Sequence, residues 1–216
     1  MERNANNLKE LSIGEFTRAA DKYETDDAGV YNICKKDYPD ILAEVEKEPF
    51  RDLLDAGCGT APMLSLLTKR FPEAHFTGID LTPRMIELAK AKSLPNTVLV
   101  CGDCENLPFD SDSFDVVICS QSFHHYPHPE LFFRSVSRCL RSNGRLILRD
   151  MTMGNNRLLH WFVNTLELPF LNLLGSGDVH CYNRKEIIAL CSQSGLTLES
   201  FEQRKWFRLH AVIRKQ

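Results

Sequence analysis

The segment Leu53-Leu-Asp-Ala-Gly-Cys-Gly-Thr-Ala61 restricts the possible folds of this chain more than any other part of the sequence. An apolar run leads into two glycines, Gly57 and Gly59, and apolar residues at helical spacing follow them. Glycine allows a sharp turn and lets the backbone approach a ligand where a Cβ atom would collide. A strand, a glycine turn and a helix in this order are typical of a doubly wound α/β sheet, in which ligands bind at the carboxyl ends of the strands.

Short β-rich runs alternate with helical patterns through the middle of the chain, which predicts βαβ units around a parallel sheet. The runs are almost continuously apolar, as in strands covered on both faces, and they span residues 53–56, 76–79, 98–101, 115–119 and 145–149. Two later runs, 197–202 and 207–213, are joined by a short connection and should pair antiparallel. We therefore expect an α/β, doubly wound, Rossmann-like sheet of seven strands, with five parallel strands, an antiparallel C-terminal pair and helices on both faces.

Proline, glycine and capping residues mark the predicted helix ends. Pro129 opens a helix that should end near Asn143-Gly144, because proline fits the first helical position. Asn183 and Glu186 have the spacing of a capping box, so a last helix should begin there and stop at Gly195.

The length of the chain suits one domain with a full core, and we expect a single domain over residues 1–216. Two amphipathic stretches, 14–31 and 35–47, belong to an N-terminal helical cover (1–48) that should pack over the ligand edge of the sheet. The parts that follow are a cofactor-binding core, a substrate-side insertion, and the last helix with two terminal strands, at residues 49–150, 151–182 and 183–216.

Composition argues against several classes of protein. A formal net charge of −3 gives no overall attraction to phosphate backbones, so we expect no nucleic-acid partner. The eight cysteines lie mostly in apolar runs and should be buried thiols of a reducing compartment. Cys101 and Cys104 have the spacing of a zinc or redox pair, but no second pair accompanies them.

Met1–Lys9 lacks the apolar core of a secretory signal. Polar residues interrupt the apolar stretch 158–174. We therefore expect a cytoplasmic protein without a membrane span.

Acidic residues stand at the ends of three consecutive predicted strands. Asp55 precedes the first glycine by two positions, Asp80 ends the second strand, and Asp103 follows the third. A carboxylate at Asp80 can accept hydrogen bonds from both hydroxyls of a ribose, although it could instead only cap the helix region after Thr82. A carboxylate at Asp103 can accept a hydrogen bond from an adenine amino group, although Gly-Asp can also be a simple turn. An NAD-dependent oxidoreductase is disfavoured, because a dinucleotide fold requires a third glycine where this chain has Pro62.

Three motifs give the chain a family resemblance. They are the glycine segment, Asp103-Cys-Glu-Asn-Leu-Pro-Phe-Asp-Ser-Asp-Ser-Phe-Asp115, and Ser122-Phe-His-His-Tyr-Pro-His-Pro129. With them the chain resembles the class I S-adenosylmethionine-dependent methyltransferases, and more narrowly the ubiquinone/menaquinone-biosynthesis group with its type 11 methyltransferase domain. The likeness runs from about Leu53 to Asp150, and it departs from the family at Ala61, where a third glycine is common.

This resemblance implies S-adenosylmethionine as the cofactor. It places the glycine loop and Asp55 at the methionine part, Asp80 at the ribose and Asp103 at the adenine. Phe16 and Tyr23 are faintly similar to the N-terminal segment that covers the cofactor in this group. The residues expected to bind the cofactor are Asp55, Ala56, Gly57, Cys58, Gly59, Asp80, Leu81, Met85, Asp103, Cys104, Ser120 and Gln121.

The expected function is S-adenosylmethionine-dependent methyl transfer to a small-molecule acceptor by in-line displacement, which depends mainly on alignment. Alternatives are an RNA or protein methyltransferase, and a regulator that binds the cofactor without catalysis. Ser120-Gln-Ser-Phe123 differs from the Asp/Asn-Pro-Pro-aromatic motif of enzymes that methylate base amines, which argues against DNA as acceptor.

The catalytic residue stays unknown at this level. His124, His125 and Tyr126 follow the fourth strand, where a general base would lie, but they could equally shape the loop. Weaker candidates are Asp150, His180 and Tyr182. We expect no metal ion, because no carboxylate or cysteine set accompanies His124, His125 and His128.

Acceptor recognition is expected in residues 151–182 and in the N-terminal helices. The insertion carries apolar side chains that either wall an apolar acceptor pocket or pack on the domain as an ordinary helix pair. They are Leu158, Leu159, Trp161, Phe162, Leu166, Phe170 and Leu171.

Overall fold

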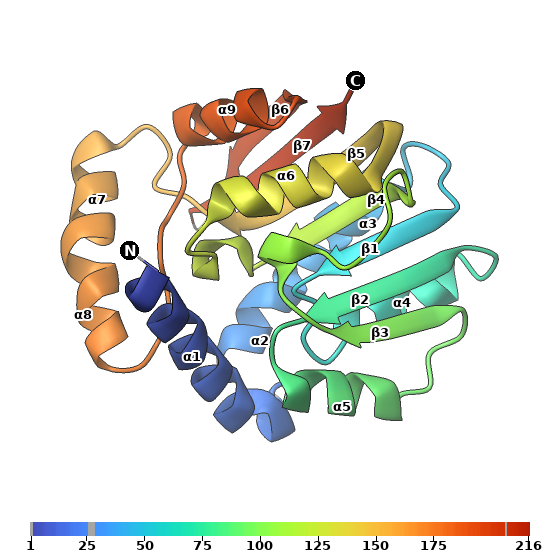
Figure 1. Ribbon diagram of the computed structural model, residues 1–216, viewed down its shortest axis with the longest axis horizontal. Helices are drawn as coiled ribbons and strands as arrows, with labels where there is room; N and C mark the ends of the chain where they lie inside the picture. Colours follow the sequence, from blue (N-terminus) through green and yellow to red (C-terminus); the bar gives the residue numbers. More distant parts are fainter. Residues whose placement is uncertain (1, 26–28, 206) are drawn as a thin grey trace.

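The computed structural model describes residues 2–25, 29–205 and 207–216. In this part of the chain one mixed sheet has the strand order β3-β2-β1-β4-β5-β7-β6 (Figure 1). The strands are β1 (Asp52–Ala56), β2 (His75–Asp80), β3 (Thr97–Cys101), β4 (Phe114–Ser120), β5 (Leu140–Met151), β6 (Leu196–Arg204) and β7 (Arg208–Lys215). Strands β1 to β5 are parallel, and β7 runs antiparallel to β5 and β6. The predicted sheet of five parallel strands and an antiparallel C-terminal pair is confirmed.

The helices follow the predicted alternation with the strands. They are α1 (Glu2–Ala19), α2 (Gly29–Cys34), α3 (Tyr38–Val45), α4 (Pro62–Arg70), α5 (Pro83–Ala91), α6 (Pro129–Cys139), α7 (Arg157–Phe162), α8 (Leu168–Leu173) and α9 (Arg184–Gln193). Short turns of 3-10 helix are η1 (Ala20–Lys22), η2 (Lys35–Asp37), η3 (Cys104–Asn106) and η4 (Phe123–His125), and the π-helical turn η5 (Val163–Glu167) joins α7 to α8. The capping box of Asn183 and Glu186 is present at the start of α9, as predicted.

The order of the strands reverses at β1 and β4, which are neighbours at the centre of the sheet. Leu53, Phe76 and Thr97 are aligned across β1, β2 and β3, and Leu53 also pairs with Val116 of β4. The four strands therefore end at one edge of the sheet. In a doubly wound sheet this is the edge where ligands bind.

Alternate residues of the central strands face opposite sides of the sheet. Leu53 and Ile147 pack in one core with residues of α3, α4 and α5. Leu54 and Leu148 pack in the other core with residues of α6 and α9. Because both faces are covered, the central strands carry apolar side chains toward both sides of the sheet. The predicted helices on both faces are confirmed.

The N-terminal helices differ from expectation in two respects. Helix α1 begins at Glu2, not near residue 14, so the polar start of the chain already belongs to it. It lies along the ligand edge of the sheet (Figure 1), whereas α3 packs on one face. The physical reason is that Ile41 and Val45 lie one helical turn apart and are fully buried against that face.

Helix α6 ends at Cys139, earlier than the predicted end near Asn143-Gly144. Leu140 is already extended and pairs with Phe114 of β4. The backbone of Leu140 therefore belongs to the start of β5.

Strand β3 corrects the expectation that the parallel strands are covered on both faces. It is an edge strand, and Val98 is 60% exposed. For the same reason Cys101, at the end of β3, is exposed, contrary to the expectation of buried cysteines. The other seven cysteines are buried, and all eight are free thiols.

The insertion 151–182 holds α7, η5 and α8 beside α1 (Figure 1). Its inward face forms a small apolar cluster of Val163, Leu168 and Cys181, against which Leu159 and Leu171 pack. Its outward face exposes between 47% and 83% of seven large apolar side chains, which are Leu158, Trp161, Phe162, Leu166, Phe170, Leu173 and Leu174. Packing on the domain therefore holds for only part of the predicted set. None of the described helices combines the length and apolar character needed to cross a bilayer.

Candidate functional site

A cleft with about 680 Å³ of empty space lies at the carboxyl ends of β1 to β4. Nine of the twelve predicted cofactor-binding residues line it, namely Gly57, Gly59, Asp80, Leu81, Met85, Asp103, Cys104, Ser120 and Gln121. The rest of the lining consists of Lys9, Ser12, Phe16, Tyr23, Thr82, Ser122, His125 and Tyr126.

The glycine turn after β1 brings the backbone against Ser122. Gly57 has a φ of +79°, and a Cβ atom at this position would lie 2.1 Å from Ser122 Oγ. Gly59 has a φ of +54° and donates its N–H to Asp80 Oδ2 at 2.9 Å. Ala61, which replaces the glycine common in the resembled family, also lies in the left-handed region, with a φ of +63°. In this Gly57 cradle the backbone packs directly on Ser122, which leaves no room for a side chain on residue 57.

Asp80 fills the structural role that the sequence left open and also lines the cleft. Its Oδ1 accepts the N–H of Thr82 at 2.8 Å, and its Oδ2 accepts the N–H of Gly59. Burial raises the pKa of Asp80, and the two backbone hydrogen bonds oppose that rise. Each carboxylate oxygen can accept a further hydrogen bond. Asp80 therefore fixes the loop and still has acceptor capacity for a ligand.

The other three predicted residues lie outside the main cleft. Asp55 and Cys58 line an adjoining cavity of about 310 Å³, which shares Gly57 and Ser120 with the cleft. Ala56 is fully buried in the core and lines neither cavity. Burial, with the charge of Asp80 second, raises the pKa of Asp55 to about 7. A cation bound in this cavity would favour the ionised carboxylate.

Helix α1 contributes Phe16, which the family resemblance had placed over the cofactor, and two cleft residues that were not predicted, Lys9 and Ser12. Lys9 Nζ lies 2.7 Å from Asp103 Oδ2, and it also pairs with Glu105. Lys9, Ser12 and Phe16 are three and four positions apart, so they share one face of the helix. Their spacing is visible in the sequence, but Lys9 lies in a polar stretch without apolar periodicity, which hid the start of the helix.

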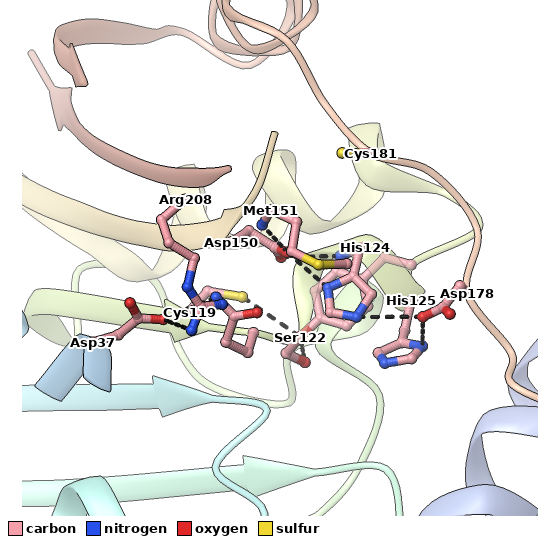
Figure 2. Close-up of polar contacts among 12 residues, drawn as sticks. Asp37, Cys119, Ser122, His124, His125, Asp150, Met151, Asp178, Cys181 and Arg208 are labelled. Atoms are coloured by element: carbon pink, nitrogen blue, oxygen red, sulfur yellow. Dashed lines mark hydrogen bonds and ion pairs between the residues drawn. The ribbon is translucent and has the colours of Figure 1, made fainter. Parts of the chain in front are cut away.

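Ser120 and Gln121 line the cleft at the end of β4, as predicted. Gln121 donates from Nε2 to Asp37 Oδ2 at 2.9 Å. Asp37 is buried and lies 2.8 Å from Arg149 and 3.1 Å from Arg208 (Figure 2). This charge network fixes the position of the Gln121 side chain. Nothing in the sequence around Asp37 indicated the network.

His125 and Tyr126 form an aromatic wall of the cleft. The Tyr126 hydroxyl lies 2.8 Å from Ser122 Oγ, and Phe16 packs edge-on against His125 with 5.2 Å between ring centroids. His125 Nδ1 lies 3.2 Å from the carbonyl oxygen of Gly177, so Nδ1 donates and Nε2 carries the lone pair. Burial, together with the charge of His124, lowers the pKa of His125 to about 4. His125 is therefore a neutral hydrogen-bond acceptor near pH 7.

His124 lies beside His125 among acidic groups (Figure 2). Its Nδ1 donates to Asp150 Oδ1 at 2.7 Å, and its Nε2 lies 3.4 Å from Asp178 Oδ1. Burial opposes protonation, but the charge and hydrogen bond of Asp150, with Asp178 and Glu15, raise the pKa of His124 to about 9. Burial, with Asp178 second, raises the pKa of Glu15 to about 7. His124 is thus a buried cation held by carboxylates.

We expected no metal ion because no carboxylate set accompanied the histidines, and for His124 and His125 this reason is wrong. Asp178 lies within reach of His124 and His125, so the histidines do have a carboxylate beside them. Asp178 lies in an irregular segment between α8 and α9, and no motif in the sequence marked it as a partner of the histidines. The hydrogen bonds of His124 to Asp150 and of His125 to Gly177 nevertheless occupy one nitrogen of each ring.

The weaker catalytic candidates separate in space. Asp150 supports His124, as described. His180 instead lies 3.0 Å from Glu186, and Tyr182 packs in the core against Phe123 with 4.3 Å between ring centroids. Neither His180 nor Tyr182 lines the cleft.

Comparisons with known proteins agree with this geometry. A family profile described as a methyltransferase domain matches residues 54–148. A phthiotriol/phenolphthiotriol dimycocerosates methyltransferase of Mycobacterium leprae is 42% identical over 113 residues, which are 52% of this chain and 42% of that protein. The demethylmenaquinone methyltransferase of Thermotoga maritima is 29% identical over 182 residues, 81% of this chain and 78% of that protein.

A solved structure shares the fold. The S-adenosylmethionine-dependent methyltransferase from Mesorhizobium loti superimposes with a TM-score of 0.69 at 18% identity, over 83% of this chain and 97% of that one. The chain is thus similar to methyltransferases over residues 54–148 and shares the fold of S-adenosylmethionine-dependent methyltransferases. Every predicted cofactor-binding residue lies inside the range that the methyltransferase-domain profile matches. The chain spans about half the length of the mycobacterial relatives, 42% to 56% of each.

Proposed function

We propose that this methyltransferase transfers a methyl group from S-adenosylmethionine to a small-molecule acceptor that binds against His125. The cleft supports this proposal. It has a glycine cradle and acidic strand ends on the cofactor side, a neutral histidine beside them, and α1 as its cover. Methyl transfer by in-line displacement needs mainly such alignment of two bound partners.

The chemistry of the cleft fits the cofactor. When bound, S-adenosylmethionine supplies an electrophilic methyl group on a positively charged sulfonium. We assign Gly57, Gly59 and Asp55 to the methionine end, Asp80 to the ribose hydroxyls and Asp103 to the adenine amino group. Three carboxylates suit a ligand that carries positive charge and no phosphate. Gly57 lines the cleft without a side chain, so its backbone can contact that ligand directly.

His125 is our candidate for orienting the acceptor. Its Nε2 lone pair is fixed by the hydrogen bond from Nδ1 to Gly177, so it can accept a hydrogen bond from a hydroxyl or similar group. Burial, with the charge of His124 second, lowers the pKa of His125 and so favours its neutral form. Phe16 and Tyr126 offer apolar surface for the body of the acceptor.

A small molecule is the acceptor class we favour, because two relatives are named for phthiotriol and demethylmenaquinone substrates. We also propose a cytoplasmic location, supported by eight free cysteines. The second candidate function is a regulator that binds the cofactor without turnover, since the same cradle and carboxylates would serve it.

Turnover decides between these functions. The purified protein is incubated with methyl-labelled S-adenosylmethionine and a panel of phenols, hydroquinones and carboxylic acids, and labelled product is counted. We expect product with at least one class, and a fall of about 100-fold in kcat for His125→Ala, because an orienting acceptor or base contributes on this scale. His128→Gln, outside the cleft lining, should retain activity. Cofactor binding without product in any class would instead support the regulator.

A further inference from the structure

A second group of metal-ligand side chains lies outside the cleft, where α7 meets α9. His160 of α7, His180 and Glu186 of α9 each present one ligand atom, and the three atoms lie within 4.8 Å of one another. Glu186 Oε1 is 3.0 Å from His180 Nε2 and 3.4 Å from His160 Nε2. Between 17% and 35% of each side chain is exposed, so an ion and a completing water can enter from solvent.

We propose that His160, His180 and Glu186 bind a zinc-type divalent transition-metal ion that fastens α7 to α9. Zinc bonds of about 2.0–2.1 Å in a tetrahedron place neighbouring ligand atoms about 3.3–3.4 Å apart. The observed separations of 3.4 and 3.0 Å need only a small adjustment. Two imidazoles and one carboxylate favour zinc and its neighbours over magnesium or calcium, which prefer oxygen ligands.

Two of the ligands are oriented by separate contacts. Glu186 Oε2 accepts the N–H of Asn183 at 2.8 Å in the capping box, which turns Oε1 toward the histidines. The backbone N–H of His180 donates to the carbonyl of His124 at 3.2 Å. Such outer contacts orient the ligands before an ion arrives.

Asn164 links His160 to the segment that carries His180. It donates from Nδ2 to the carbonyl oxygens of His160 and Cys181, both at 3.1 Å, so α7 and the segment that carries His180 are fixed together. Asn183 Nδ2 lies 3.3 Å from His160 Nε2. Asn164 Nδ2 lies at the same distance from this atom. An ion would displace these two neutral contacts and no positively charged group.

The histidines of the cleft are a poorer metal site. There His124 Nδ1 bonds to Asp150, and His125 Nδ1, which faces Asp178, bonds to Gly177. In the outer group both Nε2 atoms face one carboxylate oxygen. An ion there would secure the insertion beside the cleft, and its binding does not depend on methyl transfer.

Metal binding to the chelator-treated full chain tests this site. Calorimetric titration with ZnCl2 should show one equivalent bound, CoCl2 should give visible absorption typical of tetrahedral cobalt, and MgCl2 should show no binding. Glu186→Gln keeps an acceptor for the capping box but loses the charged ligand, and it should weaken zinc binding at least about tenfold, as should His160→Gln. Zinc should also slow hydrogen exchange in residues 157–162 of the wild type.

Two controls separate this site from other binding. His75→Gln removes an exposed histidine 3.3 Å from Asp52 and should leave zinc binding unchanged. Asp178→Asn, in the cleft group, should also leave it unchanged. No zinc binding by the wild type, equal binding by Glu186→Gln, or loss of binding in Asp178→Asn would each overturn the proposal. Because no acceptor is used, failure here leaves the proposed methyl transfer untouched.

Discussion

The charge of His124 is the feature of a single residue with the clearest measurable consequence. Its pKa in the folded protein, about 9, lies above the ordinary value of 6.5, because Asp150, Asp178 and Glu15 outweigh the effect of burial. Protonated His124 therefore contributes its full stability below pH 6.5, and that contribution is lost as the pH rises through 9. Burial and the charge of His124 in turn lower the pKa of His125 beside it.

We predict that His124→Asn removes this pH dependence. Asparagine can donate to Asp150 from nearly the position of Nδ1 but carries no charge. The wild type should exceed the variant in free energy of unfolding by roughly 3 kcal/mol at most near pH 6, and the difference should shrink toward pH 9.5. Urea unfolding at several pH values measures it. A difference that stays constant with pH would mean that His124 is neutral in the fold.

At the scale of elements, the contact between α1 and the segment before α9 determines how the cleft is covered. Gly177 has a φ of +75°, and a Cβ atom there would lie 2.7 Å from the backbone nitrogen of Ser12. Backbone cannot move aside as a flexible side chain can, so a larger residue must displace α1. Lys9, Ser12 and Phe16 would move with it away from the cleft.

We predict that Gly177→Ala weakens cofactor binding about tenfold and speeds hydrogen exchange in α1, while the sheet stays protected. Gly175→Ala is the matched control, because Gly175 also has a positive φ, +90°, but its Cβ would meet nothing nearer than Arg18 at 3.8 Å. Equal effects of the two variants would assign the loss to backbone strain and contradict the role of the α1 contact.

Elements with local signals could be predicted from the sequence, and elements placed by distant partners could not. The strand and glycine turn at 53–61 and the capping box at Asn183 each depend on neighbouring residues. Asp80 could be recognised because it ends an apolar run, although one of its two partners, Gly59, lies 21 positions away. Asp178 and Asp37 acquire their roles from partners far along the chain. The edge position of β3 depends on the strand order, which no single run of residues encodes.

For the whole molecule, the sheet supplies a cofactor edge, and segments from both ends of the matched core complete the cleft. Helix α1 covers it from the N-terminal side. Residues 175–178 contact α1, His124 and His125. The central claim is therefore that one cleft holds S-adenosylmethionine through the Gly57 cradle.

Calorimetric titration with S-adenosylhomocysteine tests this claim most directly. The wild type should bind it with a dissociation constant near 1 μM, about −8 kcal/mol, and should bind NADH more weakly. Gly57→Ala should lose binding, because its Cβ would meet Ser122 Oγ at 2.1 Å, whereas Gly195→Ala has a similar φ of +68° and open space and should bind normally. Undiminished binding by Gly57→Ala, no binding by the wild type, or tighter binding of NADH would contradict the assignment of this cleft to S-adenosylmethionine.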